Sequence, residues 1–385
     1  MTKLRVLFVN DFASTAFLFE KYMPCEIDAI YFGDHPAISP VKNKIYFKGN
    51  LNNWIKQIKE LSKKYDLFVC LGWPAAAICY LASVNYVMYF VDSLIEPEDR
   101  LRKKMPSFQR NMILEIFKEA LNHSNKVVAG GIHSIELLKK YRPDARQIFT
   151  FADPQMFNPD AKKIDLGQQK FTFLSPQRIE EGKGQLLLWE AVKMTKSDFV
   201  VLQTDWGDNK YYEEAISKKP EKVKIIPKIR RDNMPSYYVS ADALLGQISP
   251  THSSSIEREA ALCGIPVFCY ISMSLTDDEP FYMESKEPEE IAKYIDRIVQ
   301  DNKFREELAK RQLEWVLRTF DTKKNAQKWQ SLFEEAVKQK RNYKVETKFF
   351  VMLWLLSIYQ KITKKEFDVK FLQRKEVSIF TDNKT

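Results

Sequence analysis

The sequence predicts an α/β protein built from two doubly wound, Rossmann-like domains that face a cleft. Short apolar runs alternate with helix-like segments along the 385 residues, and this alternation is typical of parallel strands joined by crossover helices. At roughly 150 residues per domain, the length allows two domains. The alternation pauses at a polar stretch, Asp153–Gly167, and then restarts. We therefore expect one domain over residues 1–160, a second over 161–340 and a basic helical tail over 341–385.

The first half contains an uncharged run of 25 residues, Leu67–Val91, that is long enough to span a bilayer. Gly72 and Pro74 interrupt it. Strands buried on both faces of a parallel sheet are apolar throughout, so we interpret the run as strand, helix and strand of a core. The expected elements of this half are strands at Leu4–Val9, Ile27–Phe32, Leu67–Leu71, Tyr86–Phe90 and Lys126–Ala129, and helices reaching Tyr22 and at Asn52–Lys64, Ala75–Ala82 and Ser134–Tyr141.

The second half repeats the alternation and ends in three helical segments. Each expected strand is a short apolar run bounded by polar or turn residues. The strands are expected at Phe171–Ser175, Phe199–Leu202, Val223–Ile226, Ala243–Gly246 and Pro266–Cys269, and the helices at Gln185–Met194, Ile256–Gly264, Glu287–Val299, Asn302–Thr319 and Thr322–Lys340.

The basic excess of the chain is concentrated near its end. The formal net charge is +9, and eleven basic but only three acidic residues lie between Lys338 and Lys375. The rest is close to neutral, which argues against a body that wraps nucleic acid. The same region contains the apolar segment Phe349–Tyr359, which is too short to span a bilayer. Two alternatives remain open for it: a helix packed on the protein, or a helix on an anionic membrane surface.

Cysteine and histidine usage excludes several classes of protein. Five cysteines without a CxxC motif indicate neither a disulfide framework nor a zinc site, and they favour a reducing, cytoplasmic location. The first residues run directly into a strand without a secretory pattern. Four histidines do not suffice for a histidine-rich metal site, and no metal is expected.

Two segments of the second half contain candidate anion ligands. Arg178 and Lys183 lie on a glycine-containing loop between an expected strand and helix, where a guanidinium fork and an ammonium group are suited to a diphosphate. Ser253–Ser255 precede another expected helix, whose N-terminal N–H groups and dipole favour anions. Taken separately, the first segment is better explained as an ordinary solvated loop and the second as a plain capped helix.

Together, five segments in order resemble glycosyltransferase family 4, the retaining enzymes of GT-B fold also called glycosyl transferases group 1. The resemblance covers roughly residues 127–340. Glu259-Ala-Ala-Leu-Cys-Gly-Ile-Pro-Val looks like the family's Glu-Ala-x-Ala-x-Gly-x-Pro-Val signature, and Arg178 and Lys183 match its basic pair. The other segments are Phe151–Pro159, Arg230–Asp242 and Pro288–Ala326.

The resemblance implies a hexosyl-type transfer from a nucleoside-diphosphate sugar to an acceptor hydroxyl, with retention and without a metal or other cofactor. Arg178, Lys183, Glu259 and Thr251 are then the catalytic candidates, and Glu259 holds the nucleotide ribose. His252 and Ser253–Ser255 complete the donor-binding set with the basic pair. The first domain would then receive a glycan or lipid-linked acceptor, as in surface glycan assembly. Separately, the basic residues around Phe349–Tyr359 lead us to expect that the tail contacts the cytoplasmic face of a membrane, with a helix packed on the protein as the alternative.

The sequence departs from the family pattern at several positions. Thr251 stands where the family has a glutamate, and His252-Ser253-Ser254 replaces Gly-Phe-Gly. Threonine hydrogen-bonds but carries no charge, and Glu257 is a potential substitute. The glycine-rich loop and histidine usual in the first domain have no match. The candidate contacts there are Asp11, Asp92, Trp73, Tyr89 and the loop at Ser93–Arg102. These departures motivate an alternative: a non-catalytic protein of the same fold that binds nucleotide sugar or a partner.

Overall fold

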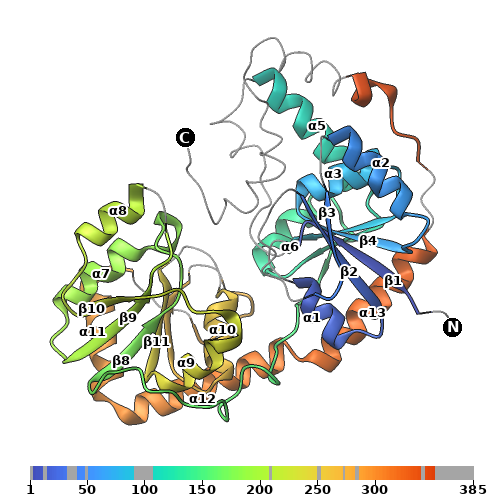
Figure 1. Ribbon diagram of the computed structural model, residues 1–385. Helices are drawn as coiled ribbons and strands as arrows, with labels where there is room; N and C mark the ends of the chain where they lie inside the picture. Colours follow the sequence, from blue (N-terminus) through green and yellow to red (C-terminus); the bar gives the residue numbers. More distant parts are fainter. Residues whose placement is uncertain are drawn as a thin grey trace. The chain divides into compact units, whose positions relative to one another are not determined.

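The computed structural model describes residues 3–11, 15–32, 41–47, 51–90, 107–207, 210–248, 253–271, 274–281, 286–339 and 343–351. The chain divides into two compact units (Figure 1). Unit 1 comprises Met1–Phe151 and the segment that begins at Thr322, and unit 2 comprises Ala152–Asp321.

Unit 1 contains a fully parallel sheet of seven strands in the order β3-β2-β1-β4-β5-β6-β7. Val6 on β1, the third strand in this order, lies between Ile27 and Leu67 of its neighbours. The parallel sheet predicted from the alternation is confirmed. The strands are β1 (Arg5–Val9), β2 (Glu26–Phe32), β3 (Lys44–Phe47), β4 (Leu67–Leu71), β5 (Tyr86–Phe90), β6 (Lys126–Ala129) and β7 (Arg146–Gln147).

Two hydrophobic cores cover the two faces of this sheet. Successive side chains of a strand point to opposite faces, so Leu7 and Val9 enter one core and Val6 and Phe8 the other. Helices α2 (Leu51–Leu61), α3 (Trp73–Leu81) and α5 (Ser107–His123) cover the first face, and α1 (Thr15–Tyr22) and α13 (Thr322–Lys338) cover the second (Figure 1). Helix α6 (Ile132–Lys139) follows β6.

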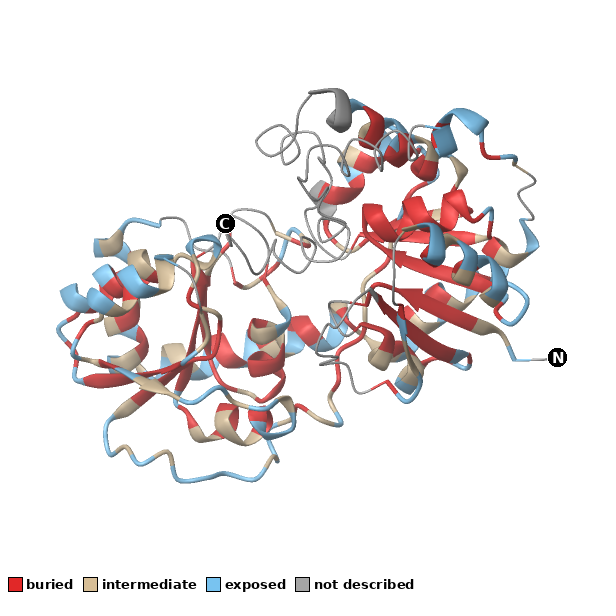
Figure 2. Cartoon of the chain, turned by 45° about the horizontal axis from the view of Figure 1, so that its top comes forward, coloured by how far each residue is buried: buried red, intermediate tan, exposed pale blue. Residues whose placement is uncertain are grey.

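The long uncharged run lies in the core of unit 1, as predicted. Every residue of β4, α3 and β5 is buried (Figure 2). The run is therefore apolar because its two strands are buried on both faces of the sheet and the helix between them is buried as well. No helix among the described residues is long and apolar enough to cross a bilayer.

Unit 2 contains five parallel strands in the order β10-β9-β8-β11-β12, and its doubly wound topology is also confirmed. The strands are β8 (Phe171–Ser175), β9 (Phe199–Thr204), β10 (Val223–Ile226), β11 (Ala243–Ile248) and β12 (Val267–Tyr270). Helices α7 (Gln185–Met194) and α11 (Pro288–Gln300) bury apolar residues against one face. The remaining helices are α8 (Lys210–Ser217), α9 (Met234–Ser240), α10 (Ser255–Leu262) and α12 (Asn302–Thr319).

The compact units differ from the expected domains at the C-terminal end. We expected residues 322–340 in the second domain, whereas α13 packs in unit 1 with Trp329, Leu332 and Phe333 in its core. The start of the expected tail also packs there, since Phe349 is fully buried with its ring 5.9 Å from that of Tyr80. Phe350 and Val351, the next two residues, are exposed. The rest of the tail lies outside the described residues.

Candidate functional site

The strand order of unit 2 reverses between β8 and β11. From β8 the chain proceeds outward to β9 and β10, then returns to the other side of β8 and continues from β11 to β12. Open α/β sheets bind ligands where the strand order reverses in this way. The loops after β8 and β11 are the two segments that the sequence analysis selected as anion ligands.

The loop after β8 brings Lys183 to the end of β11. Lys183 ends the short 3-10 helix Glu181–Lys183, and its ammonium group donates to Oε1 of Gln247 at 2.7 Å. The next residue, Gly184, has a φ of 70°, and a Cβ there would lie 2.4 Å from the carbonyl oxygen of Ile248. Only glycine permits this close approach of the two backbones.

Arg178 lies on the same loop and contacts both a carboxylate and an aromatic ring. Its Nη1 is 3.4 Å from Oε2 of Glu180, and its Cζ is 4.8 Å from the ring centroid of Trp206. The N–H of the following residue, Ile179, donates to the carbonyl of Trp206 at 2.7 Å. The arginine is thereby placed at the ends of both β8 and β9.

Trp206 and Lys228, which were not among the residues predicted from the sequence, extend this cationic region. Lys228 follows β10, and its ammonium nitrogen is 4.1 Å from the same Trp206 centroid. Partial desolvation, and then the positive charge of Arg178, lower the pKa of Lys228. The signal that would have found both residues is their position, because each comes within two residues of a strand's carboxyl end.

A capping box closes the N-terminus of α10. The carboxylate of Glu257 accepts a hydrogen bond from the backbone N–H of Ser254 at 2.8 Å and another from that of Gln247 at 3.0 Å, and it also contacts the Ser254 hydroxyl. Glu257 is fully buried. It therefore links the end of β11 to the start of α10, and it is not exposed as a substitute for the missing glutamate.

The three serines of the expected cradle have different environments. Ser253 is fully buried and donates its hydroxyl to the buried carboxylate of Glu279, so it does not offer this hydroxyl to a ligand. Ser254 is half-buried in the capping box, and Ser255 is exposed. Thr251 and His252 lie outside the described residues.

Glu259 is buried in an ion pair with Arg231. The guanidinium Nη2 lies 2.6 Å from Oε1 of Glu259. Burial raises the pKa of the Glu259 carboxyl, and the adjacent guanidinium opposes this shift. The ring of Phe157 lies 5.3 Å from Cζ of Arg231. The family-signature glutamate therefore already has a cationic partner, which the sequence analysis did not anticipate.

The candidate contacts of unit 1 have structural roles where they are described. Asp11 is buried, and its carboxylate accepts the N–H of Thr15 at 2.7 Å, which is the capping role of an ordinary aspartate. Trp73 stacks on Phe117 with centroids 5.6 Å apart, and Tyr89 is buried. The expectation that Trp73 and Tyr89 contact an acceptor is wrong, because both lie in the core. Asp92 and the loop 93–102 lie outside the described residues.

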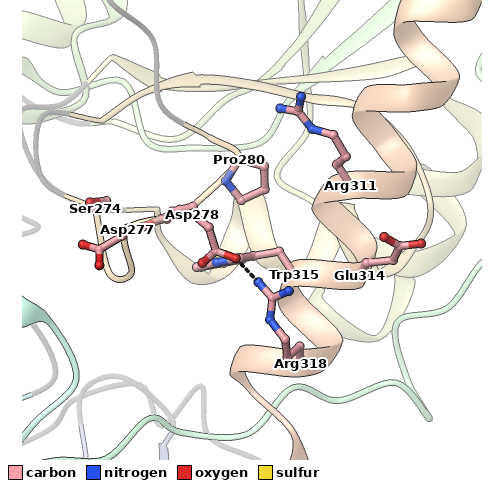
Figure 3. A pocket seen from close by; sticks show the side chains of 9 residues that line it. Ser274, Asp277, Asp278, Pro280, Arg311, Glu314, Trp315 and Arg318 are labelled. Atoms are coloured by element: carbon pink, nitrogen blue, oxygen red, sulfur yellow. Dashed lines mark hydrogen bonds and ion pairs between the residues drawn. The ribbon is translucent and has the colours of Figure 1, made fainter.

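A cavity of about 570 Å³ lies between α12 and the loop 274–280 (Figure 3). Asp278 pairs with Arg318 across it, while Asp277, Glu279 and Glu314 add negative charge to its lining. This mixed and acidic lining is unsuited to a diphosphate. No cluster of three or more His, Cys, Asp or Glu able to hold a metal ion occurs among the residues described.

The family model Glycosyl transferases group 1 matches residues 157–315, which cover most of unit 2. The predicted resemblance to this family is confirmed over these residues. No curated protein matches the sequence significantly.

Solved structures match the fold over most of the chain. HepE of Anabaena, solved with UDP-glucose, is 16% identical with a TM-score of 0.69, covering 86% of this chain and 99% of that protein. Sucrose-phosphate synthase of Thermosynechococcus elongatus is 14% identical with a TM-score of 0.68, covering 88% and 100%. A glycosyltransferase of Rickettsia africae is 17% identical with a TM-score of 0.66, with the same coverage. The fold is GT-B, and with the family match it supports a nucleotide-sugar glycosyltransferase.

Proposed function

We propose that this protein is a retaining, metal-independent glycosyltransferase that moves a hexose from a nucleoside-diphosphate sugar to an acceptor hydroxyl. The observation that carries the proposal is the pair Arg178 and Lys183 at the point where the strand order reverses. In such a reaction the bond from the anomeric carbon to the diphosphate breaks and the acceptor oxygen bonds to that carbon. The proton of the acceptor hydroxyl passes to the departing diphosphate.

The two cations act on the leaving group. Negative charge accumulates on the diphosphate as the bond breaks, and fixed positive groups stabilise it more than they stabilise the bound substrate. The guanidinium supplies a planar fork and the ammonium a compact charge. Ser254 and Ser255 at the start of α10 are the further candidate phosphate contacts, together with Thr251 and His252.

Glu259 is the proposed partner of the nucleotide ribose. A carboxylate accepts hydrogen bonds from two vicinal hydroxyls, and the ion pair with Arg231 orients the Glu259 carboxyl for this role and favours its charged form against the effect of burial. UDP and UDP-glucose are bound in HepE, which makes uridine nucleotides the first donors to test here.

The acceptor is proposed to be a glycan or a lipid-linked sugar at the cytoplasmic face of a membrane. Phe350 and Val351 are exposed next to the buried Phe349, so the segment packs on unit 1 through one side and leaves apolar side chains in solvent. Basic residues follow it in the sequence. Apolar contact and basic charge together favour an anionic surface.

Release of nucleoside diphosphate from sugar donors is the direct test. Arg178→Ala and Lys183→Ala are each expected to weaken donor binding or turnover by about 2 kcal/mol, the effect of losing a charge-assisted contact. Lys224→Ala is the matched control, because Lys224 is an exposed lysine of β10 that bonds only to Gln168 among the described residues. Wild-type binding and turnover in both variants would remove the phosphate clamp from the mechanism.

A non-catalytic role remains the second candidate, favoured by Thr251 in place of the family's glutamate. The same assay separates the two. Donor binding without release of nucleoside diphosphate, in the presence of varied acceptors, supports a binding subunit, whereas multiple turnovers support the transferase.

A further inference from the structure

Lys228 is a cation that has no counterion among the residues that the structure describes. Its ammonium group contacts the ring of Trp206, and Arg178 contacts the same ring. The carboxylate of Glu180 lies 3.4 Å from Arg178, whereas Lys228 forms no ion pair within the described chain. Two positive charges thus share one aromatic ring, and one of them is uncompensated.

The residue that carries this ring is anchored through its backbone. The carbonyl of Trp206 accepts the N–H of Ile179, and the N–H of Asp205 donates to the carbonyl of Ile226, each at 2.7 Å. These bonds tie the residues after β9 to the ends of β8 and β10. The Tyr212 hydroxyl adds a bond of 2.5 Å to Asp205. The backbone that carries Trp206 is therefore anchored to both neighbouring strand ends, and its ring lies beside Lys228 as well as Arg178.

The electrostatics favour an anion at this position. The charge of Arg178 contributes to lowering the pKa of Lys228, as expected when one cation faces another. Lys228 is exposed and so accessible from solvent. An anion that contacts both groups replaces their mutual repulsion with two attractions, and it does so without a large rearrangement because both already lie beside the same ring.

We propose that Lys228 is a third cationic ligand for the phosphates of the nucleotide donor, with Trp206 as the positioning residue that holds it beside Arg178. The inference rests on the proposed function, which supplies the diphosphate. It deepens that function by assigning phosphate recognition to three strand ends, β8, β9 and β10. The ligand class is a nucleoside diphosphate, and the proposed contacts are with its phosphates, not with its base or sugar.

Calorimetric titration of the full chain with UDP, GDP and ADP tests the assignment. With whichever of these binds, Lys228→Met is expected to weaken affinity about tenfold, the effect of one lost charge-assisted contact, while Lys228→Arg retains most of it. The affinity of the matching nucleoside, which lacks phosphate, stays unchanged. Lys224→Met on β10 is the control and leaves both affinities unchanged.

The positioning role of Trp206 is tested by measuring how its substitution affects diphosphate affinity with and without Lys228. Trp206→Leu weakens diphosphate binding in the wild-type background but has much less effect when Lys228 is already methionine, and Trp206→Phe retains part of the affinity. Equal losses in both backgrounds would show a merely structural role and overturn the positioning assignment.

The outcomes separate this proposal from the one on which it rests. A wild-type chain that binds none of the three nucleotides overturns the proposed function and this assignment with it. A chain that binds one of them, with Lys228→Met binding equally well, overturns the assignment of Lys228 alone. A Lys228→Met variant that loses nucleoside affinity to the same degree also overturns it, because the loss is then independent of phosphate.

Discussion

Replacing Gly184 by alanine is expected to destabilise unit 2 and displace Lys183. A Cβ at this position would lie 2.4 Å from the carbonyl oxygen and 2.9 Å from Cβ of Ile248, and the φ of 70° is unfavourable for alanine. The left-handed conformation costs about 1–2 kcal/mol, and overpacking against backbone adds roughly 1–3 kcal/mol. We therefore expect a loss of about 2–5 kcal/mol in urea unfolding, together with weaker binding of nucleoside diphosphate.

Alanine variants of two other glycines of unit 2 separate the cost of the left-handed backbone conformation from the cost of the close contact with Ile248. Gly167 has a φ of 65° with nothing within 4 Å of the added Cβ, so its alanine variant is subject to the conformational cost alone. Gly182 has open space and no positive φ, so Gly182→Ala should be neutral or slightly stabilising. We therefore predict that the loss of unfolding free energy is largest for Gly184→Ala, smaller for Gly167→Ala and smallest for Gly182→Ala. If Gly184→Ala and Gly167→Ala cost the same, the close contact with Ile248 does not constrain the loop.

Four further outcomes follow from the structure. Arg231→Met leaves the carboxylate of Glu259 buried without its partner and should cost about 3 kcal/mol in unfolding experiments, with part recovered when Glu259→Gln is added. Nucleotide release should persist in excess EDTA; restoration by manganese after a loss would contradict this. The pKa of Glu335 is lowered to about 2, chiefly by its hydrogen bond with Arg146, so the carboxylate stabilises the fold above its ordinary pKa and less as the pH falls towards 2; the stability gap to Glu335→Gln should close over that range. Finally, the full chain should sediment with phosphatidylglycerol vesicles at low salt and a chain ending at Val351 should not; equal sedimentation of the two would show that the residues after Val351 do not bind the membrane.

The sheets were predictable because their signals are local. Each strand of unit 2 coincides with a short apolar run. In unit 1, Gly72 and Pro74 interrupt the long apolar run, which allowed β4 and β5 to be predicted as core strands in place of a membrane-spanning helix. The edge strands β3 and β7 were missed, since Lys44–Phe47 and Arg146–Gln147 are short and partly polar. Edge strands are paired on one side only, which weakens the apolar pattern.

The candidate site was only partly predictable, because side-chain partners come from distant segments. Arg178 and Lys183 follow one strand and were found from that position. The bonds that determine the roles of Ser253 and Glu259, to Glu279 and Arg231, join residues 26 and 28 positions apart. Trp206 belongs to the site through contacts with residues on two other strand ends. Nothing in the local pattern of one segment encodes such partnerships.

The return of α13 to unit 1 has a consequence for biosynthesis. Trp329 is fully buried, with its ring 4.9 Å from those of Phe19 and Tyr89, and its indole N–H donates to the carbonyl of Phe149 at 2.9 Å. Unit 1 therefore lacks part of its core until α13 has left the ribosome, long after its sheet has been synthesised. Within the described part of the chain, unit 2 is one continuous stretch, Ala152–Asp321, that has been synthesised by then. The usual order, in which N-terminal domains fold first, is reversed: the inserted unit can finish folding while the unit that begins the chain still exposes apolar side chains to chaperones.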